Sequence, residues 1–222
     1  MGVKSLLSLA VENLRVIVRI DGVDVSRADN NGGVDPWHVL VPVNRFLATG
    51  EPTTAVIACC PGCGPDCDAV EARIRREGDV VRWEWGRRGT RWEGERRTTL
   101  FDASSYDAEV ARLGADYSWE TAVRRAGRLM LTDLVLPPGV EAVRARANGA
   151  DELEVWLEEP DEYQIFVRVP WDEERPDESA AAARAVLAGP TSRWSAEWFS
   201  VQWWQEAPPA YADPSWRRKE FP

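Results

Sequence analysis

The chain has few of the residues from which recognisable enzyme sites are built. Its 222 residues include a single histidine, His38, so a Ser or Cys triad would depend on that one imidazole. The sequence contains no Gly-rich phosphate loop, no Gly-x-Ser-x-Gly elbow and no His-Glu-x-x-His motif. These absences favour a binding protein without catalytic activity. An enzyme of unrecognised type is the alternative.

Long apolar runs and positive charge are also in short supply. No stretch approaches the roughly 18 apolar residues of a transmembrane helix. The short apolar run at 5–11 continues into a strand pattern, so we expect it to belong to the fold and not to a signal peptide. Lys and Arg total 27 against 37 Asp and Glu, a net charge of −10. This charge argues against nucleic-acid backbones and membrane surfaces as partners and favours a basic protein.

Cysteine is confined to one place. All four cysteines fall within nine residues, at positions 59, 60, 63 and 67. A secreted disulfide framework spreads its cysteines along the chain to join distant segments. The clustering therefore predicts a reducing compartment and a cytoplasmic location.

The segment 60–64, Cys-Pro-Gly-Cys-Gly, has the spacing and composition of a zinc knuckle, in which two thiolates reach one ion. No second Cys-x-x-Cys completes a zinc ribbon, so the remaining ligands would come from the same loop, His38 or a carboxylate such as Asp66 or Asp68. The alternatives are redox chemistry and a reduced, Gly-rich turn with buried cysteines. The candidate ligands for Zn²⁺ are Cys60, Cys63, Cys67 and His38.

Apolar alternation predicts mainly strands in the first half. The Asp21-Gly22 turn and the turn at 77–79 mark hairpins. We expect the cysteines to lie on a turn between two antiparallel strands. Helical spacing predicts two helices that begin near Ser104 and Ser118 as caps. The expected strands are 14–20, 39–43, 54–60, 70–75, 81–85 and 98–101, and the apolar stripes of the helices span 106–113 and 119–130.

Pro137-Pro138-Gly139 interrupts the helical pattern and is the candidate domain boundary, which gives lobes 1–136 and 140–222. The second lobe has the order β-β-β-α-β, and the class expected for the chain is α+β, with antiparallel sheets and a few packed helices. Its expected elements are strands at 143–147, 153–157 and 163–169, a helix over 177–187 and a strand over 194–204.

Acidic residues are concentrated in one segment. Residues 151–178 hold twelve acids and two arginines, so this segment carries as much net negative charge as the whole chain. It is either an exposed sheet face or a docking surface for a basic protein, as immunity proteins and other inhibitors of basic nucleases present. Alternation with Leu153, Val155 and Leu157 predicts that the acids point outward. The candidate contacts are Glu152, Glu154, Glu158, Glu159, Asp161 and Glu162.

Two other segments are candidate surfaces. Residues 73–97 hold nine arginines against five acids, with Trp83, Trp85 and Trp92 among them. Such a hairpin is either a stacking platform for nucleic acid, supported by the zinc knuckle, or a solvated face. Five tryptophans between 194 and 216 either fill the core or form an interface anchor.

Several segments between Val39 and Leu131 carry a resemblance. They are the Cys/Gly turn, Arg-Arg-Glu-Gly-Asp-Val-Val-Arg-Trp at 75–83, Leu-Phe-Asp-Ala-Ser-Ser-Tyr at 100–106 and Asp-Tyr-Ser-Trp-Glu-Thr at 116–121. In this order they resemble a family of actinobacterial proteins whose function is unknown. The resemblance implies a bacterial, cytoplasmic origin and assigns no site residue.

Overall fold

The computed structural model describes residues 3–26, 31–88 and 96–220. The chain forms two compact units, 1–119 and 120–222, and each contains antiparallel sheet with packed helices. The expected α+β class is confirmed.

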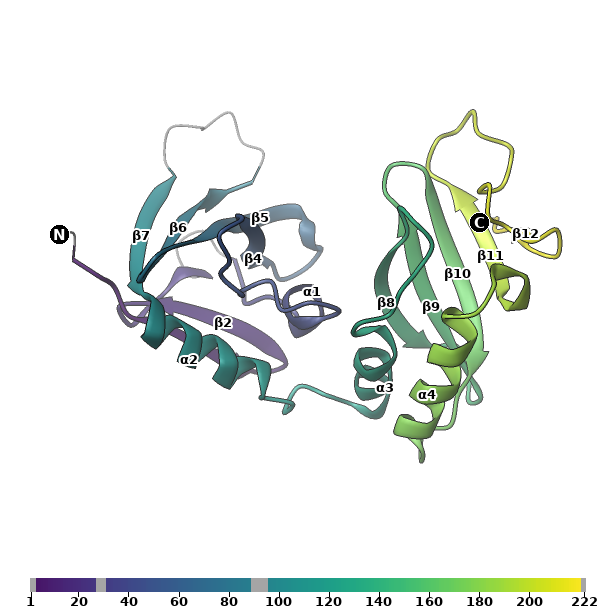
Figure 1. Ribbon diagram of the computed structural model, residues 1–222, viewed down its shortest axis with the longest axis horizontal. Helices are drawn as coiled ribbons and strands as arrows, with labels where there is room; N and C mark the ends of the chain where they lie inside the picture. The colour runs from purple at the N-terminus through teal and green to yellow at the C-terminus, as the bar shows by residue number, and fades with distance from the viewer. Residues whose placement is uncertain (1–2, 27–30, 89–95, 221–222) are drawn as a thin grey trace. The chain divides into compact units, whose positions relative to one another are not determined.

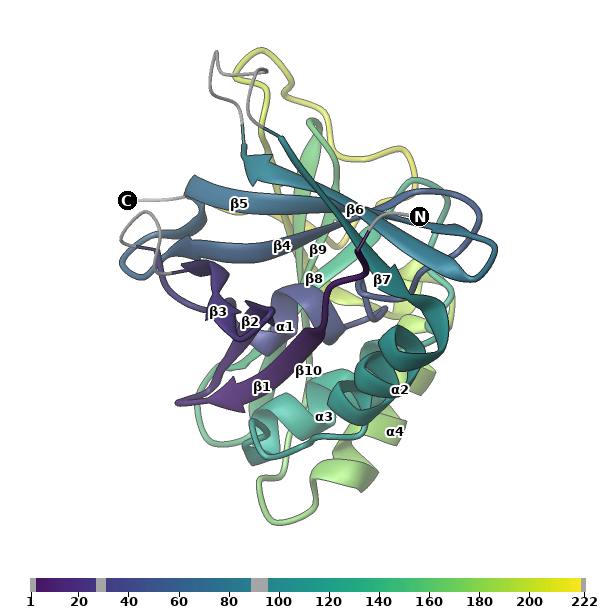
Figure 2. The ribbon, with the colours of Figure 1, turned by 90° about the vertical axis from the view of Figure 1, so that its left-hand side faces the viewer.

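The first unit contains two sheets and two helices. One sheet has the order β1-β2-β3 and the other the order β4-β5-β6-β7, and neighbouring strands are antiparallel. Figure 2 shows this unit from the front, with α2 beside β1 and β7. Its elements are β1 (Leu7–Glu12), β2 (Arg15–Ile20), β3 (Val23–Asp24), α1 (Pro36–Leu40), β4 (Thr53–Cys60), β5 (Gly64–Glu77), β6 (Val80–Arg87), β7 (Arg97–Asp102) and α2 (Ala103–Gly114).

One hydrophobic core joins both sheets and α2. At its centre Trp83 of β6 packs against Phe46, Phe101 and Tyr106, with ring centroids 5.2 to 6.1 Å apart. The polar atoms of Trp83 and Tyr106 are paired, since Trp83 Nε1 donates to the Tyr106 hydroxyl and that hydroxyl donates to the Phe46 carbonyl. The packing of Trp83 against Tyr106, together with the hydrogen bond between them, holds β6 against α2.

The strand predicted at 39–43 is wrong. Residues Pro36–Leu40 form α1, because Asp35 accepts a hydrogen bond from the Trp37 backbone N–H at 3.0 Å and Pro36 supplies a first-turn residue with a helical φ angle. A buried apolar run of five residues suits either structure, and here the cap decides.

The predicted caps of the next two helices are also wrong. Asp102 caps α2 by accepting hydrogen bonds from the backbone of Ser104 and Ser105. Thr121 caps α3, and its hydroxyl accepts from the Arg124 N–H. Each helix therefore begins at a different residue from the one that the Ser caps predicted.

The second unit is a sheet of order β12-β11-β10-β9-β8 with two helices. Both helices contact the sheet and one another, α3 at β8 and α4 at β10, as Figure 1 shows. Its elements are α3 (Ala122–Leu131), β8 (Glu141–Ala147), β9 (Glu152–Glu159), β10 (Tyr163–Pro170), α4 (Pro176–Leu187), the 3-10 turn η2 (Thr191–Arg193), β11 (Ser195–Ser200) and β12 (Arg217–Arg218).

The predicted order β-β-β-α-β holds from β8 to β11 but is incomplete. Helix α3 precedes it in the same unit, because its buried residues pack toward α4 and β8. The short β12 follows it and pairs with β11 in parallel. The units therefore divide before α3, at 119/120, whereas Pro137-Pro138-Gly139 lies inside the second unit, in the connection between α3 and β8.

Strand register gives this sheet two different faces. Leu153, Val155 and Leu157 of β9 are fully buried and pair with buried residues of β10. The alternate residues, Glu154 and Trp156 among them, lie on the opposite face of β9. The alternation predicted for this strand is confirmed.

Candidate functional site

The acidic segment divides between structural and exposed carboxylates. Glu154 is not accessible to a partner as predicted, since its side chain is only 4 % exposed. Its two oxygens accept hydrogen bonds from Arg146 at 2.9 Å and from Lys219 at 3.0 Å. Although Glu154 does lie on the outer face of β9, these two cations cover it. It ties β9 to β8 and to the C-terminal segment and is not available to a partner.

The electrostatics of Glu154 agree with this structural role. Burial alone would raise the pKa of its carboxyl, but the hydrogen bonds from Lys219 and Arg146 and their positive charges outweigh burial and lower the pKa. The carboxylate is therefore ionised in the folded chain at neutral pH.

The other predicted contacts differ in exposure. Glu152, Glu158 and Glu159 are half-buried, and Glu159 Oε2 accepts a hydrogen bond from the Tyr211 hydroxyl at 3.2 Å. Asp161 and Glu162, on the turn between β9 and β10, are exposed. Asp161 has a φ of 64°, a left-handed conformation that Asp adopts more readily than most residues. Among the predicted contacts, the exposed acids lie at this turn.

The C-terminal tryptophans also divide into two groups. Trp194, Trp198 and Trp216 are buried, and Trp194 stacks on Trp216 at 5.8 Å. Trp203 and Trp204 are 86 % and 62 % exposed, and their rings meet edge to face at 5.6 Å. The expected strand over 194–204 ends at Ser200, which leaves this pair in the loop that follows. The predicted contact residues do not include this pair.

The loop after β11 lies against the acidic turn. Val201 N–H donates to the Glu162 carbonyl at 2.9 Å, and Gln202 Nε2 donates to the Asp161 carbonyl at 2.8 Å. No basic residue occurs in 157–167 or 197–216, the two segments that meet here. We call this surface the acidic–aromatic patch; it comprises Asp161, Glu162, Val201, Trp203, Trp204 and Glu206.

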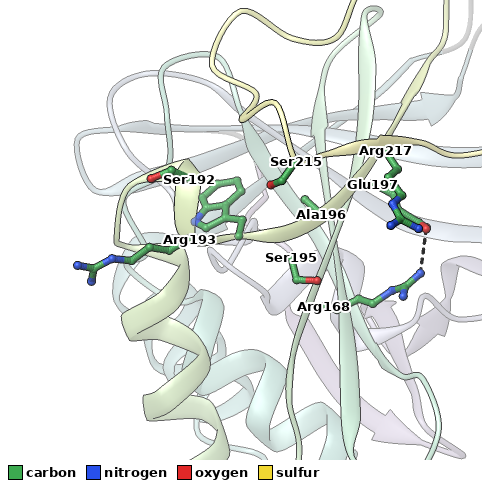
Figure 3. Close-up of a pocket in the computed structure, with 9 residues that line it drawn as sticks. Arg168, Ser192, Arg193, Ser195, Ala196, Glu197, Ser215 and Arg217 are labelled. Atoms are coloured by element: carbon green, nitrogen blue, oxygen red, sulfur yellow. Dashed lines mark hydrogen bonds and ion pairs between the residues drawn. The ribbon is translucent and has the colours of Figure 1, made fainter.

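A polar pocket of about 450 Å³ lies at the other end of β11 (Figure 3). Its one carboxylate, Glu197, pairs with Arg168 at 2.9 Å and with Lys219 at 3.4 Å. The Arg193 side chain points away from that pair. The nine lining residues include serines and arginines but no cysteine, histidine or second carboxylate, so the pocket supplies no nucleophile with a paired base.

The Arg-rich hairpin uses much of its charge internally. Arg87 binds Asp68, Arg88 binds Glu71, and Arg76 pairs with Asp107. Trp83 is fully buried in the core and is therefore not a stacking surface, while Trp85 is half-buried and donates to the Thr99 hydroxyl. Arg91 and Trp92 of this hairpin lie outside the described residues.

The cysteine cluster lies where the antiparallel strands β4 and β5 meet, as predicted, but only Cys63 is on the turn itself, since Cys59 and Cys60 end β4 and Cys67 lies in β5. The sulfur atoms of Cys60, Cys63 and Cys67 lie within 4.8 Å of one another, so the three thiols can reach one metal ion when all of them are reduced. His38 of α1 is not part of it, although it was a predicted ligand. Cys63 and Cys67 are joined by a disulfide, so these two sulfurs are not free ligands in this structure.

Neither predicted carboxylate is established as a fourth ligand. Asp68 is held by the Arg87 guanidinium, whose hydrogen bond lowers the pKa of that carboxyl. The Asp66 side chain lies outside the described atoms. Cys59 points into the core, where burial raises the pKa of its thiol, so it remains a protonated, structural cysteine.

Comparisons with protein-family models, with curated proteins and with solved structures found no match. The resemblance to actinobacterial proteins and the cytoplasmic location therefore stay predictions. Within the described residues, every helix is too short or too polar to cross a bilayer.

Proposed function

We propose that the chain is a non-enzymatic protein-binding module that binds a basic protein through the acidic–aromatic patch. The observation that carries the proposal is the adjacent pair Trp203 and Trp204, exposed beside the acidic turn. Three other tryptophans of the same region are buried, so the core does not need this pair.

The chemistry of the patch selects cations. An indole is the best aromatic partner for Lys and Arg side chains, and tryptophan is enriched among the residues that dominate binding energy at interfaces. Asp161 and Glu162, together with Glu206 in the loop, can accept charge-assisted hydrogen bonds from the same cations. With no base in either segment, the patch attracts basic side chains and repels phosphates. A regulatory or immunity-type partner of a basic protein fits this chemistry.

Nucleic acid is less well supported as a partner. The arginines of the first unit that would contact phosphate are largely engaged with carboxylates and backbone carbonyls. Trp83, one of the predicted stacking residues, is inside the core. A protein partner therefore accounts for more of the exposed features than a single-stranded nucleic acid does.

The first test captures the partner at the patch. A photo-crosslinking amino acid at position 203 should yield a covalent adduct with a basic protein in the native host. The same group at position 135 should not, because Val135 is also strongly exposed but lies in the connection between α3 and β8. Equal adducts from both positions would argue against a specific surface.

The second test separates local contacts from overall charge. Glu162→Lys combined with Glu206→Lys should slow association with the captured protein by about tenfold or more, and the wild-type rate should fall as salt rises. Glu173→Lys combined with Glu174→Lys changes the charge equally, at exposed positions beyond the other end of β10. Should both pairs slow association to the same extent, the patch has no special role.

The three-thiol group supports a second candidate function, a turn stabilised by zinc in the first unit. A structural ion contributes its binding energy to folding. Protein purified under reducing conditions should then contain about one zinc per chain and lose thermal stability when a chelator is added. Metal analysis that finds none would remove this candidate.

A further inference from the structure

The cysteine loop has a backbone feature that brings its sulfurs together. In the β4–β5 ladder Cys60 pairs with Gly64, whereas the preceding Cys59 pairs with Ala69. Residues 65–68 therefore bulge out of the ladder with no counterpart on β4. This bulge returns Cys67 to the turn, where its sulfur meets those of Cys60 and Cys63.

Contacts outside the cysteines hold the bulge in place. Arg88 donates from its side chain to the Pro65 carbonyl at 3.2 Å and from its backbone N–H to the Ala69 carbonyl at 2.8 Å. Arg87 binds Asp68 within the same bulge. None of these three contacts uses a sulfur atom, so none of them depends on the disulfide.

We propose that this loop is a redox-gated thiolate site, which binds one thiophilic cation when its three cysteines are reduced and releases it when Cys63 and Cys67 form their disulfide. The inference rests on the zinc candidate above and adds its control. Among the described residues, the donors within 4.8 Å of one another are all sulfur, a set that favours soft or borderline ions such as Zn²⁺ over hard ions. In the oxidised loop Cys60 is the single remaining thiol of the three, and one thiolate does not retain the ion.

The redox step balances with a low-molecular-weight disulfide as the oxidant. The thiolates of Cys63 and Cys67 give up two electrons and form one S–S bond. The small disulfide accepts these electrons, its S–S bond breaks, and two small thiolates leave and take up protons from solvent. Excess small thiol reverses each step, so binding is restored on reduction.

The test compares both redox states of the full chain with Cd²⁺ as the probe, because cadmium–thiolate bonds absorb in the ultraviolet. The reduced chain should bind one Cd²⁺ with an absorbance that corresponds to three thiolates, and Zn²⁺ should displace it. Oxidation with a small disulfide should abolish the absorbance, and reduction should restore it.

The possible results separate the two proposals. Equal binding by the reduced and oxidised chains would overturn the gating and leave the zinc candidate intact. Absence of binding by the reduced chain would overturn both.

Two cysteine variants test the ligand set. Cys60→Ser should lower the affinity of the reduced chain for Cd²⁺ by at least about tenfold, since one of three thiolates is lost. Cys59→Ala is the matched control, because that neighbouring thiol points into the core and should not affect binding. An unchanged affinity in Cys60→Ser would contradict the three-thiolate site.

Discussion

At the residue scale, Gly33 shows how closely the segment before α1 approaches β2. A Cβ atom there would lie 2.7 Å from the Val16 carbonyl oxygen and 2.4 Å from Ile17 Cδ1. The neighbouring Gly32 and Val34 bridge to Cys59 of β4 and to Val16 of β2. A side chain at Gly33 would therefore push the segment 32–34, which bridges β2 and β4, away from β2.

We predict that Gly33→Ala lowers the free energy of unfolding by about 1–3 kcal/mol, because the carbonyl of Val16 cannot rotate away as a side chain can. Gly50→Ala is the control, since nothing lies within 4 Å of a Cβ at that position. Urea denaturation of both variants measures the difference. Equal stability of the two would show that the segment at Gly33 can shift freely.

The same scale shows what the sequence could reveal about the patch. Trp203 and Trp204 are adjacent, and neighbouring residues of a strand point to opposite faces, so the core could not have buried both from one strand. The adjacency alone therefore signalled one exposed ring. The loop that exposes both depends on contacts with Asp161 and Glu162, which lie far away in sequence and could not be predicted.

At the element scale, β9 shows how far alternation can be used. The pattern placed Leu153, Val155 and Leu157 in the core correctly. The pattern also placed Glu154 on the outer face correctly, but on that face Arg146 of β8 and Lys219 cover its carboxylate. Periodicity assigns a residue to a face and does not reveal what covers that face. The cap of α1 was missed for a similar reason, because an apolar run concealed the Asp35-Pro36 start.

Glu154 gives a prediction for the outer face of this sheet. Glu154→Gln should destabilise the chain by about 2 kcal/mol at pH 7, because Arg146 and Lys219 lose a buried ionised partner. Its pKa is lower in the folded chain, so the stabilisation is complete above the unfolded pKa of about 4.3 and disappears as the pH falls through the lower folded value.

The measurement is thermal or urea unfolding of wild type and variant from pH 7 downward. The difference in the free energy of unfolding between wild type and variant should stay constant to about pH 5 and disappear on further acidification. Glu152→Gln, on the same face of β9 and with a single long contact at 3.5 Å to Asn148, is the control and should cost less than about 0.5 kcal/mol. A difference in the free energy of unfolding that grows in acid would contradict the assigned role of Glu154.

At the scale of the whole molecule, each of the two units carries one of the proposed binding sites. The three-thiol loop belongs to the first unit and the acidic–aromatic patch to the second. The sequence indicated two lobes and placed the boundary at its strongest helix breaker, 137–139. That breaker lies in the connection between α3, which already ends at Leu131, and β8, inside the second unit. A Pro-Pro-Gly segment interrupts a helical pattern without determining which unit the preceding helix joins.

The most direct measurement of the central claim is an NMR titration of the indole N–H signals with a synthetic arginine-rich peptide, and with a glutamate-rich peptide as control. The signals of Trp203 and Trp204, assigned by Trp→Phe variants, should shift with the basic peptide alone, and the shifts should shrink as salt rises. The Trp83 signal should not move, since its N–H donates to Tyr106 in the core. Unchanged Trp203 and Trp204 signals, or equal shifts with the acidic peptide, would contradict the claim that this surface recognises a basic protein.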